Sequence, residues 1–324
     1  MQDNTNLKPV LLQKFGKVKE SKGKNGLEYI VDCPFCGKKF KLYINPTHGA
    51  FICFSCGKKG SADELIGRSS FGPVIEPPPP GPLPSNVVDP GELVPLTKVE
   101  EDSSPILYLR QRGFDPQELS ERFGVRYCVT GRQFAGGLFD TTNTLIFPLW
   151  MNGELVGWQA RLLYNPDNID KDEECEAMGF IKDEDDDWVK PPKYWTAPGV
   201  PKGRVLFNYD VARQSDAVVV CEGPFDAIAV GRCGVATLGK GITEQQGKNV
   251  KNYWKLAIML LDPGDADTEQ NELWHGICRS IITVPVNLQG YKDAGEAPRA
   301  EIWNQIYDTA QTRGINLLDY KVIV

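Results

Sequence analysis

The sequence lacks long apolar runs. Of its 324 residues, 41% are hydrophobic, but no stretch stays apolar for the roughly 20 residues that a membrane-spanning helix needs. The first six residues, MQDNTN, have no basic start, and no apolar segment of the secretory type follows them. We therefore expect a cytoplasmic protein, long enough for two or three packed domains.

The cysteines do not suit a disulfide framework. There are nine of them, an odd number, and four form two Cys-x-x-Cys pairs. The others stand singly, several within apolar runs, as buried thiols do. This distribution predicts one metal site and free thiols in a reducing compartment. The single cysteines are Cys128, Cys175, Cys221, Cys233 and Cys278.

The two Cys-x-x-Cys pairs flank residues 37–52. Four thiolates at this spacing can complete a tetrahedral Zn²⁺ shell, which predicts a structural rather than a catalytic zinc. Two redox-active pairs are the alternative, but the βαβ pattern that they require is missing. Strand-like residues 40–44 and 50–53 indicate a zinc ribbon. The predicted ligands are Cys33, Cys36, Cys53 and Cys56.

The predicted ribbon is basic. Residues 1–72 carry a net charge of +6, so the rest of the chain carries −13. Such asymmetry indicates a head that contacts a polyanion, in which lysines bind phosphates and aromatic rings stack on unpaired bases. We interpret Phe51 and Phe54 as core residues of the ribbon, whereas Tyr43 suits either role. The lysines in question are Lys38, Lys39, Lys41, Lys58 and Lys59.

Composition divides the chain into four parts. Residues 1–72 are the ribbon, and residues 73–104 are a linker that includes the run PPPPGPLP, which favours extended polyproline II. Residues 105–212 have a mixed α/β pattern with an irregular acidic insertion at 165–190, and residues 213–324 form the last part. The fold class we predict is a multidomain α/β and α+β protein.

The last part alternates apolar strands with helices, a pattern typical of a Rossmann-like parallel sheet with both faces covered. Ligands of such sheets bind at the carboxyl ends of the strands. Two predicted strands, 217–221 and 256–261, each end in acids. Oxygen ligands at such positions suit Mg²⁺. The candidate ligands are Glu222, Asp262, Asp265 and Asp267.

These motifs resemble a known family. The run EGPFDA from Glu222 and the acids after residue 261 resemble a Toprim domain, and the segment KDAGE from Lys292 resembles one that follows in primases. The segments LIFPL, GWQAR, KYW and LFN, with the cysteine ribbon, resemble the remaining parts of DnaG-type and bacteriophage DNA primases. The resemblance covers about residues 27–300, with gaps at the linker and the acidic insertion.

The resemblance implies synthesis of short RNA primers on single-stranded DNA by metal-dependent nucleotidyl transfer. It implies one structural Zn²⁺, catalytic Mg²⁺ or Mn²⁺, ribonucleoside triphosphates as substrates, and a ribbon that selects the start site. No helicase-type phosphate loop is present, so we expect either a separate replicative helicase or a truncated product. Basic residues would contact template, primer or triphosphate, and Arg161 and Lys193 lie in matched motifs. The full set is Arg132, Arg161, Lys193, Lys202 and Lys240.

The sequence departs from the family pattern at one point. An Asp-x-Asp motif is expected at the strand end, but Gly264 occupies its third position. We favour Glu222, Asp262 and Asp265 as the catalytic set, with a shift to Asp265 and Asp267 as the alternative. Two other functions compete: a Toprim nuclease or topoisomerase-like enzyme, and a non-catalytic DNA-binding protein that uses only the ribbon.

Overall fold

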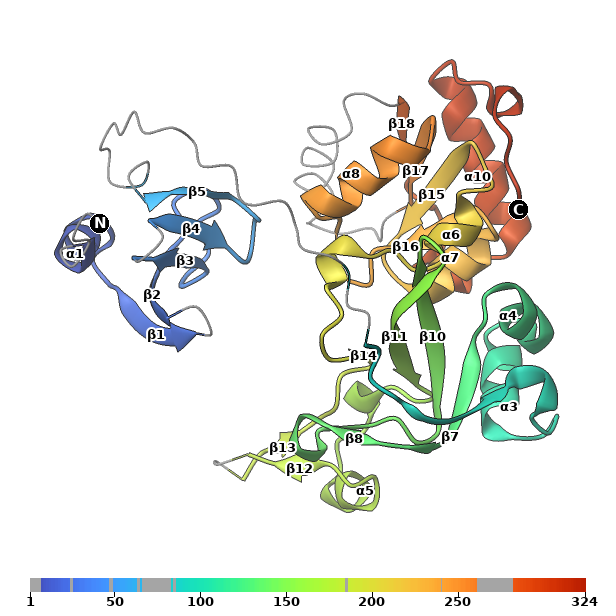
Figure 1. Cartoon of the computed structure of the whole chain (residues 1–324), viewed down its shortest axis with the longest axis horizontal. Coiled ribbons are helices and arrows are strands. Elements are labelled where there is room, and N and C mark those ends of the chain that lie inside the picture. The colour runs from blue at the N-terminus through green and yellow to red at the C-terminus, as the bar shows by residue number, and fades with distance from the viewer. Residues whose placement is uncertain are drawn as a thin grey trace. The chain divides into compact units, whose positions relative to one another are not determined.

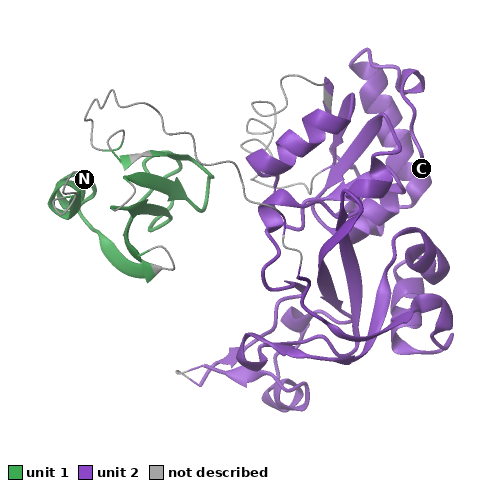
Figure 2. Ribbon diagram, viewed as in Figure 1, with its two compact units in different colours: residues 1–80 green, residues 81–324 purple. Residues whose placement is uncertain are grey.

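The chain folds as helices and strands (Figure 1) that form two compact units, residues 1–80 and residues 81–324 (Figure 2). Each unit has its own hydrophobic core. In the part of the chain that the computed structural model describes, no helix has the length and apolar character of a membrane span. The described residues are 7–23, 26–46, 49–62, 65, 83, 86–183, 186–239, 241–260 and 282–324.

The first unit is an antiparallel sheet with one helix. Its five strands pair in chain order. Alternate side chains such as Val31, Leu42 and Ile44 are fully buried against Leu11 of the helix, as expected for a sheet with one face covered. The predicted strands of the ribbon are confirmed. The elements are α1 (Leu7–Phe15), β1 (Lys19–Gly23), β2 (Gly26–Val31), β3 (Leu42–Asn45), β4 (Ala50–Cys53) and β5 (Lys59–Ser61).

The second unit begins with an antiparallel sheet of order β14-β11-β10-β7-β6. A tight turn joins β10 to β11, and its two central residues, Asn152 and Gly153, have φ angles of 56° and 81°. Turns of this kind match the strand twist, and they need residues that tolerate positive φ. The strands are β6 (Gly91–Pro95), β7 (Arg126–Gly131), β10 (Thr144–Met151), β11 (Glu154–Leu162) and β14 (Tyr194–Thr196).

Two helices precede β7. The second starts as its sequence indicates: the Asp115 side chain accepts a hydrogen bond from the Gln117 amide at 3.0 Å, and Pro116 is the first helical residue. The helices are α3 (Ser104–Gln111) and α4 (Pro116–Arg122).

A four-stranded parallel sheet of order β16-β15-β17-β18 completes the second unit. All five residues of β15 are buried, as expected for a strand covered on both faces. The predicted Rossmann-like sheet is therefore confirmed. Its elements are α6 (Tyr209–Ala212), β15 (Ala217–Cys221), α7 (Pro224–Val230), β16 (Gly234–Ala236), α8 (Glu244–Tyr253), β17 (Leu256–Met259), β18 (Ile282–Pro285) and α10 (Arg299–Thr312).

Two segments differ from the prediction. Residues 91–98 were expected in the linker, but they form β6 and a 3-10 turn (Leu96–Lys98) in which Leu96 is buried. The pairing of β6 with β7 supplies the long-range contacts that local composition does not reveal. The acidic insertion was expected to be irregular, but it holds helix α5 (Asp172–Ala177) and a short hairpin of β12 (Ile181–Lys182) and β13 (Trp188–Val189). The polyproline run at 77–82 lies outside the described residues.

The two larger sheets of the second unit share one hydrophobic core, which runs from Leu96 to Leu317. A partly buried ion pair reinforces it. Arg299 of α10 donates to both carboxylate oxygens of Glu118 in α4, at 3.0 and 3.3 Å, and also to the carbonyls of Ile228 and Ala229 at the end of α7. A bidentate pair with further hydrogen bonds fixes orientation as well as distance. The helices before β7 are thereby held on the parallel sheet.

Candidate metal centres and a basic cavity

The four predicted zinc ligands converge at one end of the ribbon. Their Sγ atoms all lie within 4.8 Å of one another. Cys33 and Cys56 are 3.8 Å apart at sulfur, as are Cys36 and Cys53. A tetrahedral ion with Zn–S bonds of about 2.3 Å places its sulfurs roughly 3.8 Å apart. The cluster therefore fits Zn²⁺, and four sulfurs leave no position for a reacting group.

Two turns of the same construction present these sulfurs. The Gly37 amide bonds the Cys33 carbonyl at 2.9 Å, and the Gly57 amide bonds the Cys53 carbonyl at 2.9 Å. Both glycines have φ near +70°, which favours glycine. Burial raises the pKa of the Cys56 thiol to about 12. Since zinc binds thiolates, its binding releases protons from this cluster.

The aromatic residues of the ribbon divide into core and surface. Phe51 is 3% exposed, as predicted, but Phe54 is 68% exposed, so its assignment to the core was wrong. Phe54 follows Cys53 beyond the end of β4, where none of the described elements covers it. Its ring and that of Tyr43 pack edge to face with their centres 4.7 Å apart. Lys58 lies 5.4 Å from the centre of the Phe35 ring, which is also half exposed. The ribbon thus presents bare aromatic rings among lysines.

A second candidate site is a cavity of about 290 Å³ in the second unit. It brings together four of the side chains predicted from the sequence: Glu222, Arg161, Lys193 and Lys202. Three other charged residues of its wall were not predicted as site residues: Arg112, Asp226 and Asp293. The remaining lining residues are Gln159, Tyr194, Gly223, Pro224, Phe225, Leu238 and Gly239.

Glu222 sits at the carboxyl end of β15, where the strand meets α7. Its carbonyl accepts a hydrogen bond from the Leu238 amide at 3.0 Å, which ties it to the chain after β16. Leu238 has a φ of 67°, unusual for a residue with a branched side chain. Such strained backbone is concentrated at functional sites. The position agrees with the expectation that ligands bind at the carboxyl ends of parallel strands.

Asp226 holds two loops of the wall together. Its Oδ2 accepts from the Gly223 amide at 3.1 Å, and its Oδ1 accepts from the Gly295 amide at 2.8 Å. Gly295 follows Asp293 in the segment that resembles the primase motif. Among the described residues, the buried Oδ1 of Asp293 has no hydrogen-bond partner. An orphaned carboxylate oxygen beside other acids fits the ligand preference of Mg²⁺.

Arg161 and Lys193 are two of the four cations that line this cavity, together with three acids. Arg161 is 3% exposed, its guanidinium lies 4.8 Å from the centre of the Tyr194 ring, and its Nη1 bonds the Lys193 carbonyl at 3.4 Å. Partial burial, and then the neighbouring cations Arg161, Lys292 and Arg112, lower the pKa of Lys193. Several cations held close together against their repulsion are typical of a site for a polyanion.

Lys202 reaches the cavity from a loop that α8 anchors. The buried Gln246 donates to the carbonyls of Lys202, Val205 and Thr237 at 2.8–3.0 Å. Gln246 also forms the capping box of α8 with Thr243. The same residues therefore start the helix and fix the loop that carries Lys202.

Arg112 enters the wall from the end of α3. Its guanidinium lies 4.6 Å from the centre of the Phe225 ring, and its Nη1 bonds the Tyr108 hydroxyl at 3.2 Å. Arg112 was not predicted as a site residue, because its place in the wall depends on packing between α3 and α7, which are far apart in the chain.

Other predicted site residues lie elsewhere or outside the description. Arg132 is exposed, bonds Asp89 at 2.5 Å and does not line the cavity. The roles of four further predicted site residues stay predictions. Asp262, Asp265, Asp267 and Lys240 lie outside the described residues.

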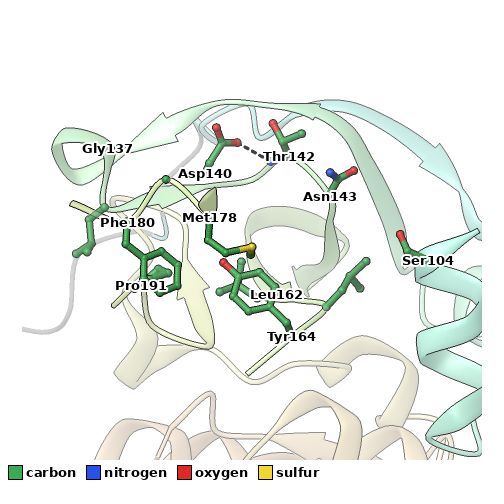
Figure 3. Close-up of a pocket in the computed structure, with 13 residues that line it drawn as sticks. Ser104, Gly137, Asp140, Thr142, Asn143, Leu162, Tyr164, Met178, Phe180 and Pro191 are labelled. Atoms are coloured by element: carbon green, nitrogen blue, oxygen red, sulfur yellow. Dashed lines mark hydrogen bonds between the residues drawn. The ribbon is translucent and has the colours of Figure 1, made fainter. Parts of the chain in front are cut away.

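A larger hollow, of about 440 Å³, lies in the same unit between the β8–β9 hairpin, Gln133–Phe134 and Phe139–Asp140, and the acidic insertion (Figure 3). Apolar side chains such as Tyr164, Met178 and Phe180 surround it. The Asp140 carboxylate at its rim accepts from the Thr142 amide at 2.7 Å. None of the predicted site residues lines it. The candidate site is therefore the smaller of the two cavities.

Comparison with known proteins returns primases. A DNA primase of Halalkalibacterium halodurans is 24% identical over 308 residues, which cover 75% of this chain and 47% of that protein. A DNA primase of Campylobacter jejuni is 22% identical over 84% of this chain and 51% of its own length. The chain thus spans about half the length of the curated relatives it matches. No protein-family model matches it.

Among solved structures, the zinc-binding and RNA polymerase domains of the Aquifex aeolicus primase match 95% of this chain and 86% of that one, at 17% identity and a TM-score of 0.47. A primase fragment of bacteriophage T7 matches 86% of this chain at 16% identity and a TM-score of 0.41. The sequence relatives confirm the resemblance to DNA primases.

Proposed function

We propose that this chain synthesises short RNA primers on single-stranded DNA by metal-dependent nucleotidyl transfer. The observation that carries the proposal is the cavity, which places Glu222 at the end of a parallel strand beside three further charged residues predicted to act there. Phosphoryl and nucleotidyl transfer need positioning and charge compensation more than covalent chemistry. A wall of acids and cations supplies both.

The acids would hold Mg²⁺ or Mn²⁺. Such an ion bridges phosphate oxygens and activates the attacking hydroxyl. We assign Glu222 and Asp293 to this group, with Asp262 and Asp265 as the proposed further ligands and Asp267 as the alternative. Asp226 acts through the backbone, because its oxygens fix the Gly223 and Gly295 amides.

The cations would hold the triphosphate and the nucleic acid backbone. Arg161 is fixed by Tyr194 and the Lys193 carbonyl, so it presents its guanidinium in one orientation. A planar guanidinium binds phosphate in a defined geometry, whereas a lysine acts as a point charge. Lys193, Lys202, Arg112 and, beyond the described part, Lys240 complete the proposed set.

The ribbon would bind the template. Exposed Phe54 and Phe35, with Tyr43, offer stacking surfaces for unpaired bases, and the surrounding lysines offer phosphate contacts. We assign zinc the role of fixing these turns. A separate helicase is the proposed partner in replication.

The test is to incubate the purified chain with single-stranded DNA, Mg²⁺ or Mn²⁺ and labelled ribonucleoside triphosphates. Short template-dependent oligoribonucleotides are the expected product. Cleavage of the template would favour a Toprim nuclease, and binding without chemistry would favour a DNA-binding protein. No primer in any trinucleotide context with either metal would contradict the proposal.

A further inference from the structure

Two neighbouring inward positions of β11, Gln159 and Arg161, line the basic cavity. They are 2% and 3% exposed. Among the described residues, Gln159 Oε1 and Arg161 Nε have no hydrogen-bond partner. A buried polar atom without a hydrogen-bond partner destabilises the fold. An acceptor and a donor left together on the wall of a cavity indicate a ligand that satisfies both.

Both side chains are held in place by their other ends. Gln159 Nε2 donates to Thr196 Oγ1 at 3.0 Å, across the β11–β14 pair. Arg161 Nη1 donates to the Lys193 carbonyl, and its guanidinium stacks near Tyr194. Since alternate residues of a strand face the same side, about 6.6 Å apart along the chain, the two groups address one region of the cavity.

The chemistry of the missing partner is restricted. Phosphate oxygens only accept hydrogen bonds, so they satisfy Arg161 Nε but oppose Gln159 Oε1. The amino groups of bases donate to Gln159 but offer Arg161 nothing. A hydroxyl does both at once. In a nucleotide the hydroxyl that distinguishes ribose from deoxyribose is the 2′-hydroxyl.

We propose that Gln159 is a specificity-determining residue that accepts a hydrogen bond from the 2′-hydroxyl of a ribonucleotide bound in this cavity, while Arg161 Nε donates to the same hydroxyl. The proposal rests on the proposed function and names the sugar that this site selects. A site built to hydrogen-bond a hydroxyl rejects the analogue that lacks it, because its buried groups are then left unpaired.

The test compares Gln159→Met, which keeps the length of the side chain and removes its polar end, with the unchanged chain. Titration calorimetry with ATP and 2′-deoxyATP gives their affinities without catalysis, and templated synthesis gives kcat/KM for each. The unchanged chain should prefer the ribonucleotide. Gln159→Met should lose roughly tenfold to hundredfold of that preference, mainly through weaker use of ATP. Because the variant also loses the hydrogen bond to Thr196, its melting temperature is measured in parallel to confirm that it is folded at the assay temperature.

Two controls make the result specific. Gln117 is exposed on α4, and Gln117→Met should retain the preference for ATP over 2′-deoxyATP. Gln159→Glu keeps an acceptor at Oε1 and should retain more of it than Gln159→Met. The inference would be overturned if Gln159→Met kept the full preference for ATP over 2′-deoxyATP. It would also be overturned if the affinity lost in the variant depended on the 3′-hydroxyl, tested with 3′-deoxyATP, or on the identity of the base. A chain that binds ATP in preference to 2′-deoxyATP but makes no primer would contradict the proposed function alone.

Discussion

Asp226 and Gly295 lie 69 residues apart in the chain, yet the Asp226 Oδ1 accepts a hydrogen bond from the Gly295 amide at 2.8 Å. The other oxygen of Asp226 binds the amide of Gly223, directly after Glu222, at 3.1 Å. One carboxylate therefore sets the distance between the β15–α7 turn and the segment that carries Asp293. The proposed metal ligands depend on that distance.

Replacing Asp226 by Asn tests this role. Asn presents an N–H in place of one acceptor, so one of the two amides loses its partner. We expect the free energy of unfolding to fall by about 1–3 kcal/mol, with a loss of primer synthesis larger than the change in stability explains. Chemical denaturation and the templated assay measure the two effects.

Asp210 offers a matched control, because its two oxygens accept from the amides of Asn152 and Gly153 at 2.7 and 2.8 Å outside the cavity. Asp210→Asn should lose comparable stability and keep its activity. Equal losses of activity in the two variants would show that Asp226 has a structural role alone.

Gly295 is crowded by the groups that form the site. A Cβ there would lie 3.0 Å from Asp226 Oδ1, 3.3 Å from Asp293 Oδ1 and 3.4 Å from Arg112 Nη2. Gly295→Ala should displace these side chains by tenths of an ångström and lower primer synthesis by roughly tenfold or more. The melting temperature should change little, since the backbone there is accessible to alanine. Full activity in Gly295→Ala would show that these groups do not position the reaction.

The lowered pKa of Lys193 predicts a pH dependence of nucleotide binding. Partial burial and the adjacent Arg161, Lys292 and Arg112 lower the pKa of Lys193 below the usual lysine value, and a bound triphosphate raises it again. Affinity should therefore be full below the pKa of the free protein and fall as the pH rises through it. ATP titrations at increasing pH measure this decline. Lys193→Arg stays charged and should move the decline to higher pH, whereas an identical profile would exclude Lys193 as its origin.

Zinc removal should affect the start of synthesis more than its continuation. The cluster fits one Zn²⁺, and without it the two turns lose the bonds that hold them. We expect one zinc per chain by elemental analysis, none in Cys36→Ser, and the full content in Cys175→Ser, whose cysteine lies in α5. Template-specific initiation should fall further than extension of a preformed primer. Equal losses in both steps would count against the ribbon as the template reader.

The sequence allowed most of the regular elements to be predicted where local signals agree. Strand 217–221 was predicted with its observed bounds because it is continuously apolar and ends at Gly-Pro. The β6 strand was missed because its place in a sheet depends on pairing with β7, which local composition does not show. Phe54 was misassigned because its exposure depends on the tertiary packing around the second Cys-x-x-Cys turn, which local composition does not show.

The candidate site was predicted in part. Glu222, Arg161 and Lys193 lie in recognisable segments, and the structure brings them to one cavity. Arg112 and Gln159 received no role, since their importance arises from long-range packing and from unpaired atoms rather than from a motif. Their signals are three-dimensional: a guanidinium near the Phe225 ring and an acceptor without a donor in the described structure.

The central claim is that Glu222 serves chemistry and not template binding. The most direct measurement compares Glu222→Gln with the unchanged chain in the templated ribonucleotide assay and, in parallel, in the binding of labelled single-stranded DNA. Glutamine keeps the size of the side chain and removes its charge, so metal binding should weaken and synthesis should fall by at least about 100-fold, with the affinity for DNA unchanged. A loss of DNA binding as large as the loss of synthesis, or synthesis at the normal rate, would contradict the account.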